Sequence, residues 1–163
     1  MKITAQEEYG LRCLMQLAQT DKEKGLTVRE IALREGLSPA YVEKLLRLLG
    51  KGGLIHSVRG VKGGYLLNKK PQEISLGSVV RALGKIPTSR EICDRFTGNR
   101  TRCIHIDNCC IRAAWETMTA AIHSFLDKTF LSDLVGGEAK VRQALNHQTL
   151  PVLNRVPYEG RNR

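Results

Sequence analysis

The residues best suited to chemistry are four cysteines that fall within eighteen positions: Cys93, Cys103, Cys109 and Cys110. Thiolates are soft, negatively charged ligands, and a flexible segment can wrap three of them around one small metal centre. Zinc would favour four ligands in paired short spacings such as Cys-x-x-Cys, which this segment lacks. The spacing therefore predicts a metal centre with three cysteine ligands.

Only one of the two adjacent cysteines is expected to bind the metal, because neighbouring side chains cannot easily face the same centre. We assign Cys109 as the ligand and keep Cys110 as the alternative. Cys13 lies among apolar residues of a helical segment, where a small buried hydrophobe is a better interpretation than a ligand. An acidic start and the absence of any run of about 18 apolar residues predict a cytoplasmic protein with no membrane contact and with free thiols.

The charge of the chain indicates a polyanionic partner. Lys and Arg number 26 against 16 Asp and Glu, a formal net charge of +10. The excess is concentrated in residues 29–70, which hold nine basic and three acidic side chains. A solvated basic face is the alternative interpretation, but these charges coincide with the helix and turn signals of a DNA-binding domain.

Helical patterns fill the first part of the chain. Apolar residues recur at helical spacing over 6–19, and Thr27 with Glu30 forms a capping box that starts a second helix, which Gly36 ends. Ser38 starts a third helix. Two short helices joined by a tight turn, the second with basic side chains exposed, are typical of a helix-turn-helix. The inward stripe of the third helix is Val42, Leu45, Leu46 and Leu49.

A β-hairpin wing is predicted after these helices, with strands over 54–58 and 65–67 and a glycine-rich basic turn over 59–64. Glycines let such a turn lie close to a sugar-phosphate backbone, and an arginine is long enough to enter a minor groove. The residues predicted to contact double-stranded DNA are Arg29, Ser38, Tyr41, Glu43, Lys44, Arg47, Arg59 and Lys62.

The second half of the chain predicts a cluster loop and a pairing helix. A short helix over 75–84 precedes a polar segment, 88–110, which has no sustained periodicity and is expected to be a loop. The next apolar residues, from Ile111 to Thr129, are spaced 4, 3, 4, 3 and 4 positions apart, as in an a/d heptad seam. The seam could pack on its own domain, but its regularity favours pairing with a second copy. The predicted dimerisation residues are Trp115, Met118, Ile122 and Phe125.

The expected fold class is therefore mainly α with a small β-hairpin wing. We divide the chain into a winged helix-turn-helix domain (1–84), a cysteine-bearing cluster-binding loop (85–110) and a dimerisation helix (111–135). The remaining residues, 136–163, are basic and poor in apolar side chains, so a mostly disordered tail is expected there.

Four segments carry a family resemblance: Glu8-Tyr9-Gly10-Leu11-Arg12, the helix pair at 27–49, the wing from Gly53 to Leu66, and Cys103, Cys109 and Trp115 at their spacing. They resemble the IscR/NsrR family of Rrf-type bacterial regulators over residues 1 to about 135. The resemblance implies a homodimeric winged-helix repressor or activator that binds a palindromic operator. It also implies a 2Fe-2S or 4Fe-4S cluster held by Cys93, Cys103 and Cys109, whose state sets the affinity for DNA.

Two positions depart from the pattern of that family. The interval from Cys93 to Cys103 is ten positions, longer than the usual five-residue gap, and Arg112 stands where the IscR type has a ligating histidine. In NsrR-like members an acidic residue on the first helix of the partner completes the cluster, and Glu8 occupies the corresponding place. His105 and Asp107 are the alternative fourth ligands. A carboxylate binds iron more weakly than sulfur or nitrogen does, so it would leave that iron open to nitric oxide or oxygen.

Two other classes of protein are the alternatives. One is a zinc-stabilised or cluster-free DNA-binding regulator. The other is a thiol redox enzyme, which would be expected to carry a Cys-x-x-Cys pair, a nucleotide-binding fingerprint or a Cys/His/Asn constellation, and the sequence has none of them. We therefore expect a regulator of transcription, and a repressor, that senses cluster supply, nitric oxide or redox state, and we do not expect an enzyme.

Overall fold

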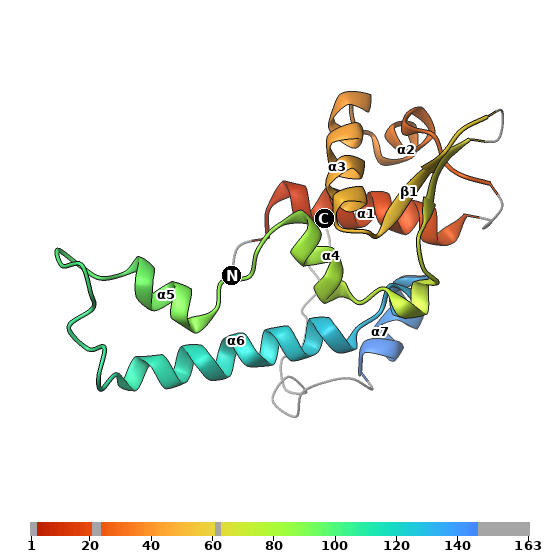
Figure 1. Ribbon diagram of the computed structural model, residues 1–163. Helices are drawn as coiled ribbons and strands as arrows, with labels where there is room; N and C mark the ends of the chain where they lie inside the picture. Colours follow the sequence, from red (N-terminus) through yellow and green to blue (C-terminus); the bar gives the residue numbers. More distant parts are fainter. Residues whose placement is uncertain (1–2, 21–23, 61–62, 147–163) are drawn as a thin grey trace, which may run out of the picture.

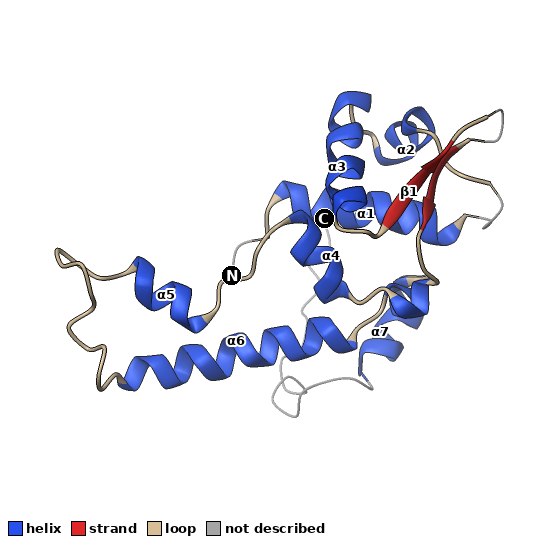
Figure 2. Ribbon diagram, viewed as in Figure 1, coloured by secondary structure: helices blue, strands red, loops and turns tan. Residues whose placement is uncertain are grey.

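The computed structural model describes residues 3–20, 24–60 and 63–146. It confirms the expected fold class, because the described chain is mostly helical with one two-stranded antiparallel hairpin, as Figure 1 and Figure 2 show. The elements are α1 (Ala5–Gln19), α2 (Val28–Glu35), α3 (Pro39–Lys51), β1 (Ile55–Val58), β2 (Gly64–Leu67), α4 (Leu76–Leu83), α5 (Ser89–Arg95), α6 (Cys110–Lys128) and α7 (Glu138–Asn146), with short 3-10 turns at Pro71–Glu73 and Leu131–Leu134.

The helix starts follow the local signals in the sequence. Thr27 accepts a hydrogen bond from the backbone amide of Glu30, and the Glu30 carboxylate accepts one from the amide of Thr27, as expected of a capping box. The left-handed conformation of Gly36, with φ of 66°, ends α2. Ser38 caps α3 by accepting from the amide of Tyr41 at 3.3 Å. These caps set the tight turn between the two helices of the helix-turn-helix.

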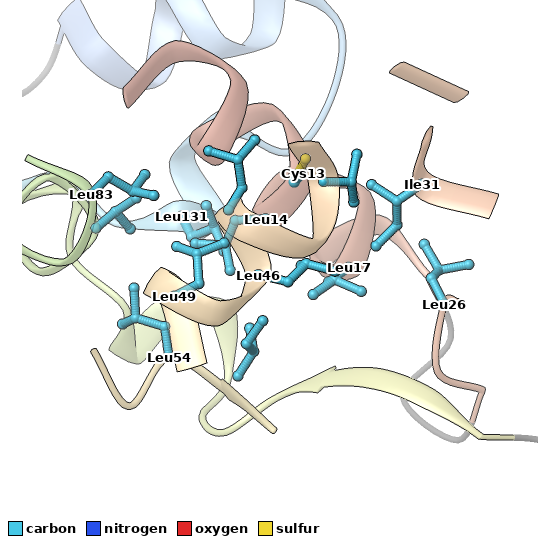
Figure 3. Close-up of a cluster of buried hydrophobic side chains, with 14 of the residues drawn as sticks. Cys13, Leu14, Leu17, Leu26, Ile31, Leu46, Leu49, Leu54, Leu83 and Leu131 are labelled. Carbon is cyan, nitrogen blue, oxygen red and sulfur yellow. The ribbon is translucent and has the colours of Figure 1, made fainter. Parts of the chain in front are cut away.

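The core lies between α1, α2, α3 and α4. The predicted stripe of α3, Val42, Leu45, Leu46 and Leu49, is fully buried, and it packs with Leu14 and Leu17 of α1 (Figure 3). Cys13 lies in the same cluster at 0% exposure, and burial raises the pKa of its thiol to about 11. The interpretation of Cys13 as a small buried hydrophobe is confirmed.

The hairpin is joined to the segment that precedes α2. Strands β1 and β2 pair with Ile55 opposite Leu67, and Val58 opposite Gly64. Tyr65 of β2 also exchanges two backbone hydrogen bonds with Leu26, at 2.9 and 3.2 Å. Gly64 makes this approach possible, because a Cβ there would lie 2.7 Å from the Leu26 carbonyl carbon. These hydrogen bonds join the wing to the segment that leads into α2.

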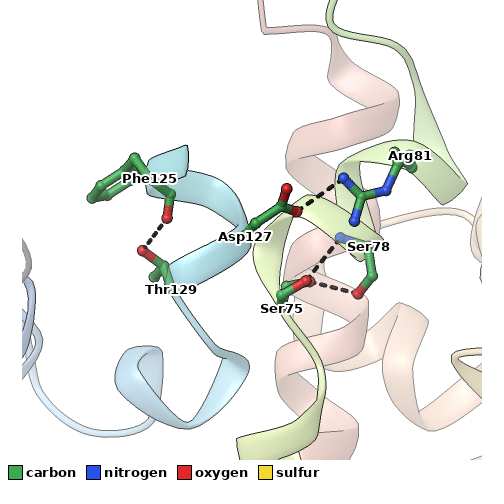
Figure 4. A network of polar contacts seen from close by, with 6 residues as sticks. All are labelled: Ser75, Ser78, Arg81, Phe125, Asp127 and Thr129. Atoms are coloured by element: carbon green, nitrogen blue, oxygen red, sulfur yellow. Dashed lines mark hydrogen bonds and ion pairs between the residues drawn. The ribbon is translucent and has the colours of Figure 1, made fainter. Parts of the chain in front are cut away.

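The C-terminal end of α6 is fastened to α4 and to the segment before it. The amide of Leu76 donates to the carbonyl of Thr129 at 2.8 Å, and Leu131 donates to Ile74 at 2.8 Å. Arg81 of α4 forms an ion pair with Asp127 of α6 at 2.9 Å (Figure 4). The other end of α6 extends away from the winged-helix domain, as Figure 1 shows.

Two segments differ from the expected organisation. Residues 89–95, placed in the cluster loop, form α5, because Thr88 and Glu91 make the same kind of capping box that starts α2. Residues 138–146, placed in the disordered tail, form α7, which carries an ion pair between Glu138 and Arg142 one turn apart and packs on the 3-10 turn after α6. The rest of that tail, 147–163, lies outside the described residues.

No helix in the described ranges is both long and apolar enough to cross a membrane.

Candidate nucleic-acid interface and cysteine segment

The exposed face of α3 carries the predicted DNA-contact residues. Because the stripe from Val42 to Leu49 is buried, Glu43, Lys44 and Arg47 point to solvent, and Tyr41 is half-buried. Arg47 and Glu43 form an exposed ion pair one turn apart, at 3.3 Å. Ser38 caps the same helix, and Arg29 is exposed in the first turn of α2. The two helices therefore present polar side chains on the surface that a helix-turn-helix offers to DNA.

The ring of Tyr41 lies in a stack of side chains from α1 and α3. Its ring meets the ring of Tyr9 edge to face, with centroids 6.1 Å apart and planes at 81°. The guanidinium of Arg12 lies 5.4 Å from the centre of the Tyr9 ring, and Lys44 Nζ lies 6.0 Å from the Tyr41 ring. This stack connects the first helix of the chain directly to the start of the recognition helix.

Glu35 anchors α2 to α1, a role that the sequence pattern did not identify. Its side chain is only 6% exposed and accepts a hydrogen bond from Arg12 Nε at 2.6 Å and another from Gln16 Nε2. The hydrogen bond and charge of Glu35 raise the pKa of Arg12. Arg12 belongs to the segment that carries the family resemblance, but its partner lies 23 positions away. Spacing alone could not reveal that pair.

Arg59 is the basic residue of the wing turn that the structure describes, and it is exposed. Arg59 follows β1 directly and is open to solvent, whereas Lys62, the other basic residue predicted to contact DNA, lies outside the described residues. Asn68 ties the base of the hairpin by donating to the carbonyl of Gly53 at 2.8 Å and contacting His56 Nδ1 at 2.6 Å. The hairpin base is therefore held while Arg59 stays available at its end.

The four late cysteines are free thiols on three structural elements. Cys93 lies on α5, Cys103 lies in the following loop, Cys109 is the N-cap of α6, and Cys110 begins that helix. The first three are half-buried and Cys110 is exposed. The soft thiol donors suit an iron–sulfur cluster in their chemistry. Nevertheless, within 3–20, 24–60 and 63–146 no three His, Cys, Asp or Glu side chains are grouped closely enough to hold a metal ion.

Arg112 braces the loop between Cys103 and Cys109. Its guanidinium donates hydrogen bonds to the backbone carbonyls of His105, at 3.3 Å, and Ile106. The amide of Ile106 in turn donates to the carbonyl of Cys103 at 3.2 Å. The position at which the IscR type has a ligating histidine therefore carries a side chain that shapes the loop backbone.

The alternative fourth ligands lie on separate elements. His105 and Asp107 are exposed in the braced loop. Glu8 is exposed on α1, where it lines an apolar cavity of about 270 Å³ together with Leu76 and Leu126. The structure thus leaves Glu8 accessible to another molecule.

The predicted dimerisation face is uncovered over the first half of α6. Ile111, Trp115 and Met118 are 58%, 37% and 42% exposed, whereas Ile122 and Phe125 are half-buried beside the winged-helix domain. The seam thus packs on its own chain only toward its C-terminal end. Three large apolar side chains in succession remain open to solvent on one helix face.

The chain is similar to known proteins of one family. Residues 3–137 match the Rrf2 family, described as iron-dependent transcriptional regulators. The chain is 36% identical to protein rrf2 of Nitratidesulfovibrio vulgaris, over 83% of this chain and 87% of that protein. It is 30% identical to the HTH-type transcriptional regulator IscR of Serratia proteamaculans, over 99% of this chain and 97% of that one.

A solved structure has the same fold. CymR, the global cysteine regulator of B. subtilis, superposes with a TM-score of 0.67 at 30% identity, covering 82% of this chain and 95% of CymR. These relatives are regulators of transcription and not enzymes, in agreement with the sequence-based prediction. The chain therefore belongs to the Rrf2 family of winged-helix, DNA-binding transcriptional regulators.

Proposed function

We propose that this regulator is a homodimer whose affinity for a palindromic operator is set by an iron–sulfur cluster bound at Cys93, Cys103 and Cys109. The observation that carries the proposal is the position of these free thiols, on the chain segment that joins the winged-helix domain to the uncovered first half of α6. The match to a family described as iron-dependent supports iron as the metal.

DNA recognition is assigned to α3 and the wing. Tyr41 and Lys44 leave the buried stripe near the start of α3, where a recognition helix reaches base edges. Arg47 and Arg29 are placed to contact phosphates, and Arg59 with Lys62 would contact the backbone or the adjacent minor groove. The two winged-helix domains of a symmetric dimer would bind two half-sites, and the operator is therefore proposed to be palindromic.

Cluster binding would draw the thiols together by rearranging the segment between α5 and α6. The apolar side chains of this segment are poorly packed, since Phe96 and Ile104 are 68% and 66% exposed. Arginines at positions 95, 100, 102 and 112 surround the cysteines in sequence and would offset the negative charge of three thiolates. When bound, a cluster would supply a centre sensitive to redox state and nitric oxide.

Glu8 is the proposed fourth ligand, contributed from α1 to the cluster segment of the other protomer. Its neighbour in sequence, Tyr9, contacts Tyr41 at the start of the recognition helix. A change in what Glu8 binds would therefore act on α1, and through the two rings on α3. His105 and Asp107 are the alternative ligands from the loop itself.

A visible absorption spectrum of the anaerobically purified full chain, with metal and sulfide analysis, tests the proposal. Brown protein that contains iron and sulfide, and that bleaches with nitric oxide or air, is the expected result. Colourless protein with one zinc per chain would replace the cluster by a zinc-stabilised regulator. Colourless, metal-free protein that still binds its operator would identify a cluster-free regulator.

A further inference from the structure

Arg12 of α1 takes part in two contacts at once. Its Nε atom lies 2.6 Å from Oε2 of Glu35, and its guanidinium carbon lies 5.4 Å from the centre of the Tyr9 ring. The side chain of Arg12 is 46% exposed, whereas that of Glu35 is only 6% exposed. A long, partly exposed side chain has many accessible rotamers, so a buried partner decides which of them is occupied. The carboxylate of Glu35 therefore determines where the guanidinium lies relative to the ring.

Glu35 stands at a position that stability alone would not favour. It is the last residue of α2, where the negative end of the helix dipole repels a carboxylate. Burial also removes its charge from water, and this cost is offset because both carboxylate oxygens accept hydrogen bonds, Oε2 from Arg12 and Oε1 from Gln16. Residues that work against local stability are expected where a structure serves function. The position of Glu35 therefore indicates a role beyond folding.

The contacts of Arg12 continue to the recognition helix. Arg12 and Tyr9 are three residues apart on α1 and so lie on one face of that helix. The Tyr9 ring meets the Tyr41 ring edge to face, and Lys44 Nζ lies 6.0 Å from the Tyr41 ring. An unbroken series of side-chain contacts therefore leads from the end of α2, across α1, to the start of α3.

We infer that Glu35 is a positioning residue for operator recognition. It holds Arg12 against the Tyr9 ring, and that ring in turn holds the ring of Tyr41. The inference rests on the proposed contact of Tyr41 with DNA, and it is independent of the cluster and its ligands. Base contacts carry the sequence information and need precisely placed side chains, whereas contacts to phosphates carry none. A loosened Tyr41 should therefore reduce affinity for the operator more than affinity for random DNA.

The test compares the affinity of the full-length Glu35→Gln variant for operator and for random DNA. A duplex that the wild-type chain selects from a random pool serves as the operator, and a scrambled duplex of the same length serves as random DNA. The ratio of the two affinities should fall about threefold to fivefold, because the contribution of the aromatic pair is largely lost. Removal of one negative charge should by itself leave the affinity for random DNA unchanged or raise it, since DNA is a polyanion.

A matched variant and a spectroscopic readout separate positioning from mere anchoring of α2. Gln16→Leu removes the other hydrogen bond of Glu35 but leaves Arg12 in place, so it should lower the midpoint of thermal unfolding and keep the ratio of affinities. The ring signals of Tyr41 in ¹H–¹³C spectra, identified with Tyr41→Phe, should shift in Glu35→Gln and stay in place in Gln16→Leu. Wild-type values of either the ratio or the ring signals in Glu35→Gln would overturn the inference.

A double-variant cycle tests the route of the effect. In a Tyr9→Leu background the aromatic pair is already lost, so Glu35→Gln should not lower the ratio further. An undiminished effect in that background would show that Glu35 acts by another path and would overturn the inference.

Tyr41→Ala tests the underlying DNA contact separately. If this variant keeps the wild-type ratio of affinities, Tyr41 is not a DNA contact, and both the proposed interface at that residue and the inference built on it are wrong. If Tyr41→Ala loses the ratio while Glu35→Gln keeps it, only the role of Glu35 is wrong.

Discussion

The ring of Tyr9 on α1 stands edge to face against the ring of Tyr41 at the start of α3, with their centroids 6.1 Å apart. Edge-to-face aromatic pairs are stabilised by the attraction between the positive ring edge and the negative ring face. Through this contact Tyr9, which is next to Glu8, holds the ring of Tyr41, a residue that we assign to DNA contact. In our proposal, α1 therefore supports the recognition helix α3 and does not itself contact DNA.

An aromatic pair of this kind stabilises its two rings by about 0.5–1.5 kcal/mol. Replacing Tyr9 with Leu removes this pair and is expected to weaken operator binding by up to about 1 kcal/mol, through the looser orientation of Tyr41. Tyr9→Phe keeps the ring and should bind like the wild type. Fluorescence anisotropy with labelled operator DNA measures the difference, and thermal melting checks the fold. Equal DNA affinity of the Leu variant would show that Tyr41 is positioned without Tyr9.

Arg59→Ala is expected to reduce operator affinity by about 1–3 kcal/mol if the side chain enters a groove. A smaller loss, equal for operator and random DNA and with a shallower salt dependence, would indicate a phosphate contact instead. Lys128→Ala removes an exposed cation at the C-terminal end of α6, outside α3 and the wing, and serves as the matched control. Unchanged binding by an Arg59→Ala, Lys62→Ala double variant would remove the wing from the interface.

A charge at Met118 is expected to separate the dimer. The side chain is 42% exposed in one chain, so Met118→Asp should leave the protomer folded, but burial of the carboxylate in a paired seam costs several kcal/mol. Sedimentation velocity should show monomers and much weaker binding to palindromic DNA. Thr117→Asp, on an exposed neighbouring position, should remain dimeric. A dimeric Met118→Asp protein would place the interface elsewhere.

Single substitutions test which of the proposed residues bind the cluster. Cys103→Ala and Cys109→Ala should each abolish the visible absorption while the protein stays folded, because the core stripes lie elsewhere. Cys110→Ala is the control and should keep the spectrum. Glu8→Ala should retain the cluster but lose it faster in air, since three thiolates remain. Loss of the cluster in His105→Ala, together with an unaffected Glu8→Ala protein, would assign the fourth ligand to the loop.

The start of α5 is expected to depend on pH. The hydrogen bond from Lys85 and that from the amide of Thr88 lower the pKa of Glu91 from an ordinary 4.5 to about 2. A carboxyl whose pKa is lower in the folded helix stabilises it above the ordinary pKa, and that contribution is lost as the pH falls from about 4.5 toward 2.

Carbon-13 chemical shifts of residues 89–95 should therefore show α5 fraying over this pH range. The Glu91→Gln variant should lose that dependence, whereas Glu116→Gln, on an exposed position of α6, should keep it. A helix signal that is constant down to pH 2 would show that the capping box does not hold α5.

Local signals in the sequence were sufficient for the winged-helix domain. The box of Thr27 and Glu30, the cap at Ser38 and the stripe from Val42 to Leu49 act within a few residues, and the structure confirms all three. The same capping pattern at Thr88 and Glu91 starts α5, but α5 is too short to carry a periodic apolar stripe, so the sequence pattern does not predict this helix. Short helices depend on their caps more than on periodicity.

The sequence by itself thus determined the elements of the DNA-binding head, the family resemblance, and the presence of thiols and of a heptad seam. Only the tertiary structure decided that Tyr9 contacts Tyr41 and that Glu35 holds Arg12. It also decided that the seam is covered at Phe125 and open at Met118. The physical reason is that helix caps and stripes are set by near neighbours, whereas contacts and coverage depend on how distant elements pack.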